Sequence, residues 1–346
     1  QAIELNPFYA NAHLQLGKIC LKEGRTSQAM MAVNMCLLLN PDGSDAFSIL
    51  NSMNTSVSKN SEVKPKGISI SKDDDAFEDI DLVLNNRIAL NPSYKIDNKI
   101  NVALTKQNHA LFEQLDSFEG NDGFWDRKYV PFYKWVFANG YFDDFTYAIS
   151  YTIENKDFKK IIDKNVDKIK AFITIFYEQW AAIMSNGNQQ LLDGKKQEVS
   201  YVYDDYTLRA FGKTDGDKRI GKWMIFNHQG KLKGKGEFNE KGERIGRWIW
   251  YDDFGNTTIT EQYVDGKLEG EYLSFYTNKN PKVVCNYKAG KLDGVYKKYN
   301  KKGALIEEKV FSEDQLDGSY TSYYPLGVSA KEYVFNYREG NPEGEL

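Results

Sequence analysis

The spacing of hydrophobic residues changes character along the chain. In the N-terminal half, apolar residues recur every three or four positions, as at Ala29, Val33, Cys36 and Leu37, which is the period of one face of an α-helix. In the last third, short aromatic runs alternate with turns that contain glycine, a pattern typical of β-hairpins. The spacing therefore predicts an α+β multidomain protein: helical repeats, an aromatic-rich helical middle, and a single-layer antiparallel sheet of hairpins.

A recurring tripeptide marks a repeat in the first helices. Leu-Asn-Pro begins at Leu5 and again at Leu39, 34 positions later. Between the two, Gly17 is small enough for a second helix to approach closely, and Gly24 suits the left-handed conformation at a helix end. Pro41 ends the second helix, because proline disfavours helical geometry in the residue before it. We therefore expect a helix pair between the two tripeptides.

Over residues 6–41 this pattern resembles the tetratricopeptide repeat, whose period is 34 residues. The sequence departs from that family at His13, Cys20 and Val33, where the family often has larger, aromatic side chains. The resemblance implies stacked helix pairs that bind other proteins. Because one repeat cannot bury its own faces, we expect the domain at 1–50 to be the end of a longer array, truncated at its start.

A linker and a helical domain are predicted between the two repeat systems. Residues 51–75 are rich in serine, asparagine and lysine and lack apolar periodicity, as in a flexible linker. Residues 76–190 return to a helical pattern, which suggests a degenerate further repeat and ends in one long helix from Phe158 to Ile183. Aromatic residues crowd positions 124–151, and rings at helical spacing favour a core over a ligand groove.

One motif, glycine–any residue–aromatic, recurs five times in the last third of the chain. The glycine spacings are 25, 24, 24 and 24 residues. A second aromatic residue follows each glycine by five positions, a third follows most of them by seventeen, and glycine-bearing turns lie between. Each unit is therefore predicted to be one β-hairpin. The glycines and first aromatics are Gly221 and Trp223, Gly246 and Trp248, Gly270 and Tyr272, Gly294 and Tyr296, and Gly318 and Tyr320.

This motif resembles the MORN repeat, in the longer bacterial variant labelled YwqK-like. The likeness is clearest in the segments Gly266–Tyr272 and Gly290–Tyr296, and it covers the chain from about Lys218 to the end. We place the hairpin domain at 200–346. The resemblance implies a protein scaffold, a membrane-associated module or a toxin-neutralising partner, and it transfers no catalytic residue.

The aromatic residues of the hairpins are the candidate interaction surface. Positions plus two and plus five after the glycine differ by an odd number, so their rings point to opposite faces of the sheet. Tyrosine and tryptophan are enriched at protein interfaces, and we expect a non-catalytic adaptor or scaffold that binds other proteins in a larger complex. A glycan- or lipid-headgroup-binding module, an antitoxin-like binding protein and an enzyme within residues 95–190 stay open as alternatives. The candidate residues are Trp223, Trp248, Trp250, Tyr251, Tyr272, Tyr276, Tyr296, Tyr299, Tyr320 and Tyr323.

Composition and missing motifs limit the remaining functions. A net charge of −4 gives no overall attraction to nucleic acid. The three cysteines and three histidines are scattered, without the spacing of a metal site, and no phosphate-binding or nucleophile motif occurs. We expect no cofactor, no metal and no enzyme activity. No apolar run reaches the roughly 20 residues of a transmembrane helix; peripheral membrane association stays open, and the repeat variant favours the bacterial periplasm or outer membrane.

Overall fold

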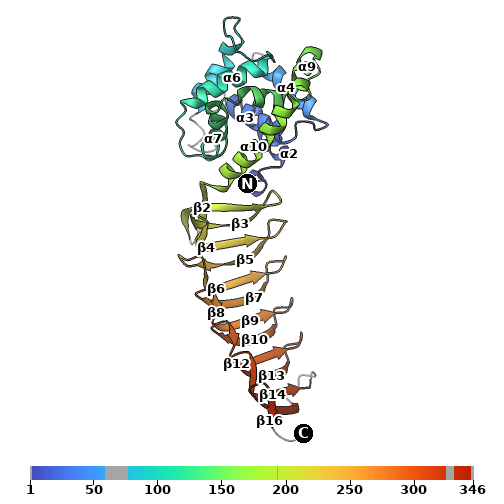
Figure 1. The fold of residues 1–346 in the computed structure, drawn as a ribbon, viewed down its shortest axis with the longest axis vertical. Coiled ribbons are helices and arrows are strands. Elements are labelled where there is room, and N and C mark those ends of the chain that lie inside the picture. Colours follow the sequence, from blue (N-terminus) through green and yellow to red (C-terminus); the bar gives the residue numbers. More distant parts are fainter. Residues whose placement is uncertain (1, 59–76, 193, 325–330, 344–346) are drawn as a thin grey trace. The chain divides into compact units, whose positions relative to one another are not determined.

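The chain folds into two compact units, Gln1–Gly187 and Asn188–Leu346. In the computed structural model the first unit is helical and the second is an antiparallel sheet of successive hairpins (Figure 1). The α+β arrangement predicted from the hydrophobic spacing is confirmed. The residues that the structure describes are 2–58, 77–192, 194–324 and 331–343.

The helical unit contains ten α-helices and one short 3₁₀ helix within the described residues. Their bounds are α1 (Ala2–Leu5), α2 (Ala10–Lys22), α3 (Thr26–Leu39), α4 (Ala46–Ser58), α5 (Glu78–Asn85), η2 (Ile88–Leu90), α6 (Ala103–Asp116), α7 (Phe124–Ala138), α8 (Phe142–Ile149), α9 (Lys156–Lys164) and α10 (Val166–Ser185).

Helices α2 and α3 form the helix pair that the 34-residue repeat predicts. Gly17 lies at a close approach of the two helices: a Cβ atom added there would stand 2.6 Å from Cγ2 of Val33. Gly24 makes the turn between them with φ +77°, a conformation that glycine adopts without steric cost. Every residue from Ser27 to Leu39 is buried. Helix α3 is therefore the central helix of the unit, enclosed on all sides.

The predicted linker at 51–75 starts too early. Residues 51–58 continue α4, which buries Leu50, Met53 and Val57. These three side chains share one helical face, and the serines and asparagines between them, which suggested a loop, occupy the other positions of the helix. The remainder of the predicted linker, from residue 59, lies outside the described residues.

The single long helix predicted from Phe158 to Ile183 is two helices, α9 and α10. The helical geometry breaks at Asn165, which has φ −115° and whose side chain donates a hydrogen bond to the Ile161 carbonyl oxygen at 2.8 Å. Asparagine side chains compete in this way with the helical backbone. Apolar residues continue on both sides of the break, with Ile162 and Ile169 both buried, so hydrophobic spacing alone did not reveal it.

The aromatic residues of the middle region form the core of the helical unit. Tyr129 and Phe132 of α7 are fully buried and contact Trp180 of α10, with ring centroids 5.6 and 6.0 Å apart. Tyr133 of α7 contacts Phe112 of α6 at 5.1 Å. These edge-to-face and tilted contacts are favourable arrangements of aromatic rings, and they join α6, α7 and α10.

The second unit is one sheet in which the strands follow each other in chain order, except that the short strands β8 and β11 lie off this path and pair with β7 and β10 (Figure 1). It begins at Asn188, twelve residues before the predicted boundary, because the first strand is mostly polar and carries no aromatic signal. The strands are β1 (Asn188–Leu192), β2 (Lys195–Asp204), β3 (Thr207–Asp215), β4 (Lys218–Phe226), β5 (Leu232–Phe238), β6 (Arg244–Tyr251), β7 (Thr257–Val264), β8 (Lys267–Leu268), β9 (Gly270–Phe275), β10 (Pro281–Lys288), β11 (Lys291–Leu292), β12 (Gly294–Tyr299), β13 (Leu305–Ser312), β14 (Gln315–Tyr323), β15 (Lys331–Arg338) and β16 (Asn341–Glu343).

The hairpins share one irregularity at the same place. In all five units the register shifts between positions plus four and plus five, as between Ile225 and Phe226 and between Trp250 and Tyr251. Such a β-bulge increases the local twist of a strand. The glycine that opens each unit has positive φ, for example +62° at Gly246, which explains why glycine occurs there in all five units.

Candidate functional site

The tryptophans of the first two hairpin units lie flat on glycines of neighbouring strands. A Cβ atom added to Gly212 would stand 2.4 Å from the indole of Trp223, and one added to Gly236 would stand 2.1 Å from the indole of Trp248. As a result, Trp223 and Trp248 are only 1% and 0% exposed. The bare backbone of glycine thus provides the space that buries a large ring in a sheet of one layer.

The same pair of rings is formed in all five units. The aromatic residue at plus two contacts the one at plus seventeen, which is its diagonal neighbour on the adjacent strand in the first four units and lies directly opposite it in the fifth. We call the side of the sheet that carries these pairs the ring face. The pairs and their centroid distances are Trp223–Phe238 (6.2 Å), Trp248–Tyr263 (6.5 Å), Tyr272–Tyr287 (5.9 Å), Tyr296–Phe311 (6.0 Å) and Tyr320–Phe335 (6.4 Å).

Cationic side chains cover several of these rings. The guanidinium carbon of Arg219 lies 4.8 Å from the ring centroid of Trp223, and that of Arg244 lies 4.6 Å from Trp248. Lys309 lies between two units, with its Nζ atom 4.8 Å from the Tyr320 ring. These are cation–π distances, at which the negative face of the ring attracts the charge.

Around Arg244 the contacts form a network. The guanidinium donates to the Tyr263 hydroxyl at 3.2 Å, and that hydroxyl donates to a carboxylate oxygen of Glu261 at 3.2 Å. The Trp250 indole N–H donates to the same carboxylate oxygen at 2.8 Å. Partial burial raises the pKa of Tyr263, and the nearby Glu261 adds to this effect. The phenol is therefore neutral at pH 7 and acts as a donor.

The ten candidate surface residues separate into three groups. Six lie on the ring face, three project from the opposite face by the alternation of side chains along a strand, and Tyr276 lies at a turn, where its hydroxyl donates to the Tyr299 carbonyl oxygen at 2.9 Å. All except the two buried tryptophans are partly exposed. The ring-face residues are Trp223, Trp248, Trp250, Tyr272, Tyr296 and Tyr320, and those on the opposite face are Tyr251, Tyr299 and Tyr323.

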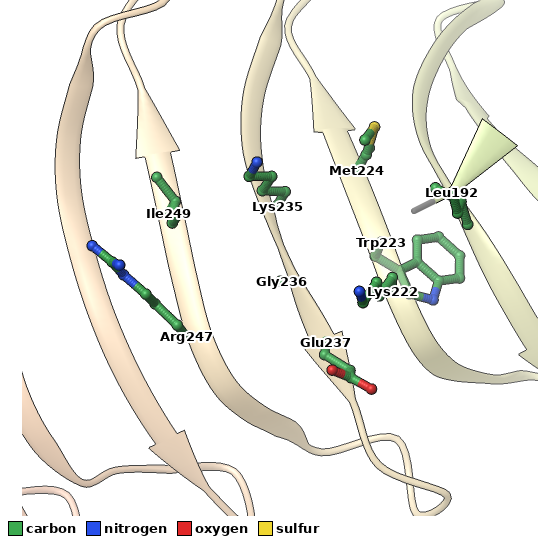
Figure 2. Close-up of a pocket in the computed structure, with 9 residues that line it drawn as sticks. All are labelled: Leu192, Lys222, Trp223, Met224, Lys235, Gly236, Glu237, Arg247 and Ile249. Atoms are coloured by element: carbon green, nitrogen blue, oxygen red, sulfur yellow. The ribbon is translucent and has the colours of Figure 1, made fainter. Parts of the chain in front are cut away.

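Two hollows in the described part of the hairpin array lie beside aromatic residues of the ring pairs. One, of about 480 Å³, is lined by the third and fourth units, including Tyr272, Tyr287 and Tyr296. The other, of about 240 Å³, lies beside Trp223 (Figure 2). In Figure 2 the Trp223 ring is turned toward Leu192, while further lining residues come from the next two strands. The first hollow is large enough for one side chain of a partner.

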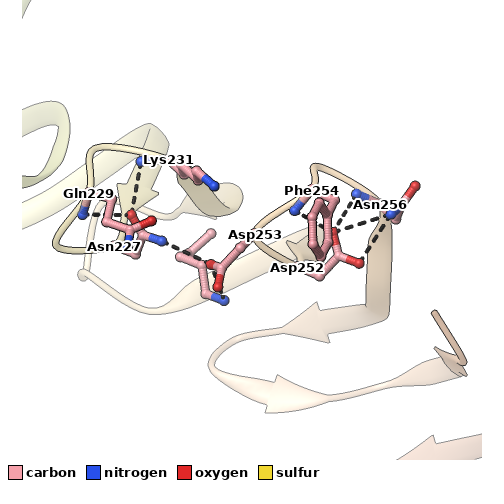
Figure 3. A network of polar contacts seen from close by, with 8 residues as sticks. Asn227, Gln229, Lys231, Asp252, Asp253, Phe254 and Asn256 are labelled. Carbon is pink, nitrogen blue, oxygen red and sulfur yellow. Dashed lines mark hydrogen bonds and ion pairs between the residues drawn. The ribbon is translucent and has the colours of Figure 1, made fainter.

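Asparagine or aspartate at position plus six builds most of the turns on one edge of the sheet, a signal that the sequence reading missed. The Asp252 carboxylate accepts from the backbone N–H groups of Phe254 and Asn256 at 2.9 and 2.8 Å, and Asn227 accepts in the same way in the preceding turn (Figure 3). Desolvation raises the pKa of Asp252, but the hydrogen bonds from Asn256 and Phe254 outweigh it and leave the pKa lowered. The turn at Tyr276 lacks this asparagine or aspartate.

The turns are also joined to one another. The Asn227 side chain donates to the Asp253 carboxylate of the next turn at 2.9 Å (Figure 3). The Nζ atom of Lys233 lies 3.5 Å from the same carboxylate. Further along, the side chains of Asn278 and Asn280 donate to the Lys301 carbonyl oxygen at 2.7 and 2.9 Å. These contacts fix each hairpin relative to its neighbour, so the ring face has a defined geometry.

In the helical unit the polar groups with altered pKa values have structural partners. His13 is buried; its Nε2–H donates to the Pro7 carbonyl oxygen at 2.9 Å, which leaves Nδ1 to accept from the Tyr129 hydroxyl at 2.6 Å. Burial lowers the pKa of Lys128 to about 8, and its ammonium donates to the carbonyl oxygens of Ile183 and Asn186 at 3.2 and 2.6 Å.

The described ranges contain neither a cluster of metal ligands nor a membrane-spanning helix. No group of three or more histidine, cysteine, aspartate or glutamate side chains there could hold a metal ion. No helix among the same residues is both long enough and apolar enough to cross a membrane.

Comparison with known proteins adds little. No family model matches the chain, and no curated protein matches it. Among solved structures, a chain titled "Crystal structure of GtfA/B complex bound to UDP and GlcNAc" is similar at a TM-score of 0.16 and 8% identity, over 34% of this chain and 22% of that chain. At this level the similarity supports no statement about fold or function.

Proposed function

We propose that the chain is a non-catalytic scaffold that binds other proteins through the ring face of its hairpin array and through its helical unit. The observation that carries this proposal is the regular row of five ring pairs on one sheet. Aromatic side chains held on a rigid backbone lose little conformational entropy when a partner binds, and extended repeat surfaces serve as binding surfaces.

The two sequence repeats support the same proposal. The 34-residue helical period and the 24-residue hairpin motif support membership of the tetratricopeptide and MORN classes, respectively. Both repeat types build long surfaces without a catalytic centre. With the hairpin variant as the only guide, we place the scaffold in a bacterial cell-envelope assembly.

Site-specific photo-crosslinking tests the proposal. A photoreactive amino acid replaces Ser274, a half-buried residue of β9 on the ring face, in cells that produce the full chain. The matched control places it at Asn286, an exposed residue of β10 that projects from the opposite face. We expect a discrete protein adduct from position 274 and none from position 286.

The alternatives give different outcomes in the same cells. If no protein adduct forms and the purified chain is retained on polysaccharide or on liposomes, the ring face is a glycan- or lipid-binding surface and the scaffold proposal is wrong. If a single toxic enzyme is the adduct and loses activity in the complex, the antitoxin-like alternative replaces it.

A further inference from the structure

The ring pair of the third unit differs from the other pairs of the array in having no cation over it. At position plus two, Trp223 and Trp248 are covered by Arg219 and Arg244, and Lys309 approaches the corresponding tyrosines of both the fourth and fifth units. Among the described residues, no cationic group lies over Tyr272 or over its pair partner Tyr287.

The sequence explains why the cation is missing. The arginines of the first two units stand two positions before the motif glycine, where the third unit has Leu268. Lys309 stands fifteen positions after the glycine of its unit, where the third unit has Cys285. Leu268 lies opposite Tyr263 in the sheet, so it occupies the ring face as Arg244 does, but it carries no charge.

The hollow of about 480 Å³ opens at this uncovered pair. Tyr272 and Tyr287 meet at 66° with centroids 5.9 Å apart, and Tyr296 lines the next side. Cys285, 2% exposed, and Ser274 are among the small residues that line the hollow. The site therefore offers ring faces at an angle to one another around a space that no side chain of the array fills.

One carboxylate, that of Glu261, lies near the hollow, and one lysine, Lys282, is among its lining residues. The Glu261 carboxylate accepts hydrogen bonds from Trp250 and Tyr263. Burial raises the pKa of Tyr272, and the negative charge of Glu261 raises it further. Of the nearby lysines, Lys298 is paired with Glu307 at 3.3 Å, and Lys282 is directed over the Tyr276 ring at 5.9 Å.

We propose that this hollow, the third-unit groove, binds a cationic side chain of a partner protein, an arginine in the first place, over the ring pair of Tyr272 and Tyr287. The same array shows the interaction within its own chain, where Arg219 and Arg244 lie over the equivalent rings. Arginine is favoured over lysine because its planar guanidinium stacks on ring faces and loses less hydration. The inference rests on the proposed scaffold function and names the chemistry by which the ring face would select its partner.

Two short peptides test the groove directly. The full chain is titrated with acetylated, amidated Gly-Gly-Arg-Gly-Gly and with the same peptide carrying glutamine, and binding is followed by saturation-transfer NMR. We expect the arginine peptide to bind about two- to thirtyfold more tightly, which is the range of one cation–π contact. Equal binding of the two peptides would overturn the proposal.

Substitutions at Leu268 and Tyr272 locate the binding. Leu268→Arg places an arginine where the first two units have one, so the groove is filled from within and the preference for the arginine peptide disappears. Leu268→Gln is the matched control and keeps the preference. Tyr272→Phe keeps the ring and the preference, while Tyr272→Ala loses it. An undiminished preference in the Leu268→Arg variant, with an unchanged circular dichroism spectrum, contradicts the proposal.

The peptide experiment and the crosslinking experiment fail independently. If the arginine preference is absent but a protein adduct forms at position 274, the scaffold function stands and the groove proposal alone is wrong. If the arginine preference is present but no protein adduct forms, the groove binds cations and the scaffold function is wrong.

Discussion

The indole of Trp248 lies against Gly236 of the neighbouring strand so closely that a single added Cβ atom would stand 2.1 Å from its Cδ2 atom. The obstacle is a fully buried ring, with no flexible chain end that could move aside. This contact repeats that of Trp223 with Gly212 and sets how the first hairpins cover their own rings.

We predict that Gly236→Ala destabilises the hairpin array by about 1–3 kcal/mol, the usual cost of overpacking a filled site. Urea unfolding followed by tryptophan fluorescence measures the change. Gly43→Ala is the control, because the atoms nearest to an added Cβ there belong to the Asn40 side chain, which can rotate away. Equal midpoints for Gly236→Ala and the unmodified chain would show that the Trp248 contact does not limit the packing.

A second prediction concerns His13 and acid. Burial lowers the pKa of His13 to about 4, although the hydrogen bond with Pro7 acts in the opposite direction. Because the unfolded value is about 6.5, the unfolded chain binds more protons between pH 6.5 and 4, and stability falls as the pH falls through this window. The loss reaches about 3 kcal/mol at pH 4.

Comparison with His13→Gln isolates this effect. Glutamine cannot be protonated in this range, so the difference in unfolding free energy between the two chains should shrink as the pH falls from 7 to 4. Thermal unfolding of both chains at several pH values measures it. A difference that stays constant over the window would mean that His13 does not titrate on unfolding.

Asp81 gives the opposite pH dependence. Burial raises the pKa of this carboxyl to about 6, against the hydrogen bond from the Ser27 backbone N–H at 2.6 Å. Because the folded pKa lies above the unfolded value of about 3.9, the contribution of Asp81 to stability is present at low pH and is lost as the pH rises toward 6. Asp81→Asn keeps an oxygen that accepts from Ser27 and carries no charge.

We therefore expect Asp81→Asn to be more stable than the unmodified chain at pH 7. Between pH 3 and pH 7 the difference in unfolding free energy between the two chains should change by about 2–3 kcal/mol in favour of the substitution. Urea unfolding at both pH values provides the measurement. The reverse order, with the substitution harmful at pH 7 and neutral at pH 3, would show that the ionised carboxylate is the stabilising form.

The turn at Asp252 tests whether the side chain at position plus six stabilises the turns. Asp252→Ala removes the acceptor of the Phe254 and Asn256 N–H groups, so the unfolding midpoint of the array should fall. Asp252→Asn restores an acceptor, as Asn227 provides in the preceding turn, and should return most of the midpoint. If the alanine and asparagine variants have the same unfolding midpoint, the turn does not need the acceptor. The lowered pKa of Asp252 would then reflect charge alone.

Much of the architecture could be predicted from the chain itself, because its signals are local. A glycine at positive φ, an aromatic residue two positions later and a further turn define one hairpin, and 24 residues later the pattern returns. The helix pair of α2 and α3 follows from Gly17, Gly24 and the 34-residue period in the same way. Each of these patterns spans only about one turn or one strand, so it can be recognised in a single sequence.

The break at Asn165, the helical course of residues 51–58 and the burial of Trp223 and Trp248 were decided by tertiary structure. Tertiary structure also decided which ring each cation meets, as where Arg244 contacts Tyr263 of the adjacent strand. Which side chain meets which ring depends on the pairing of strands and on the bulges that shift it. Hydrophobic spacing describes one element at a time, whereas a contact between elements exists only once both are placed.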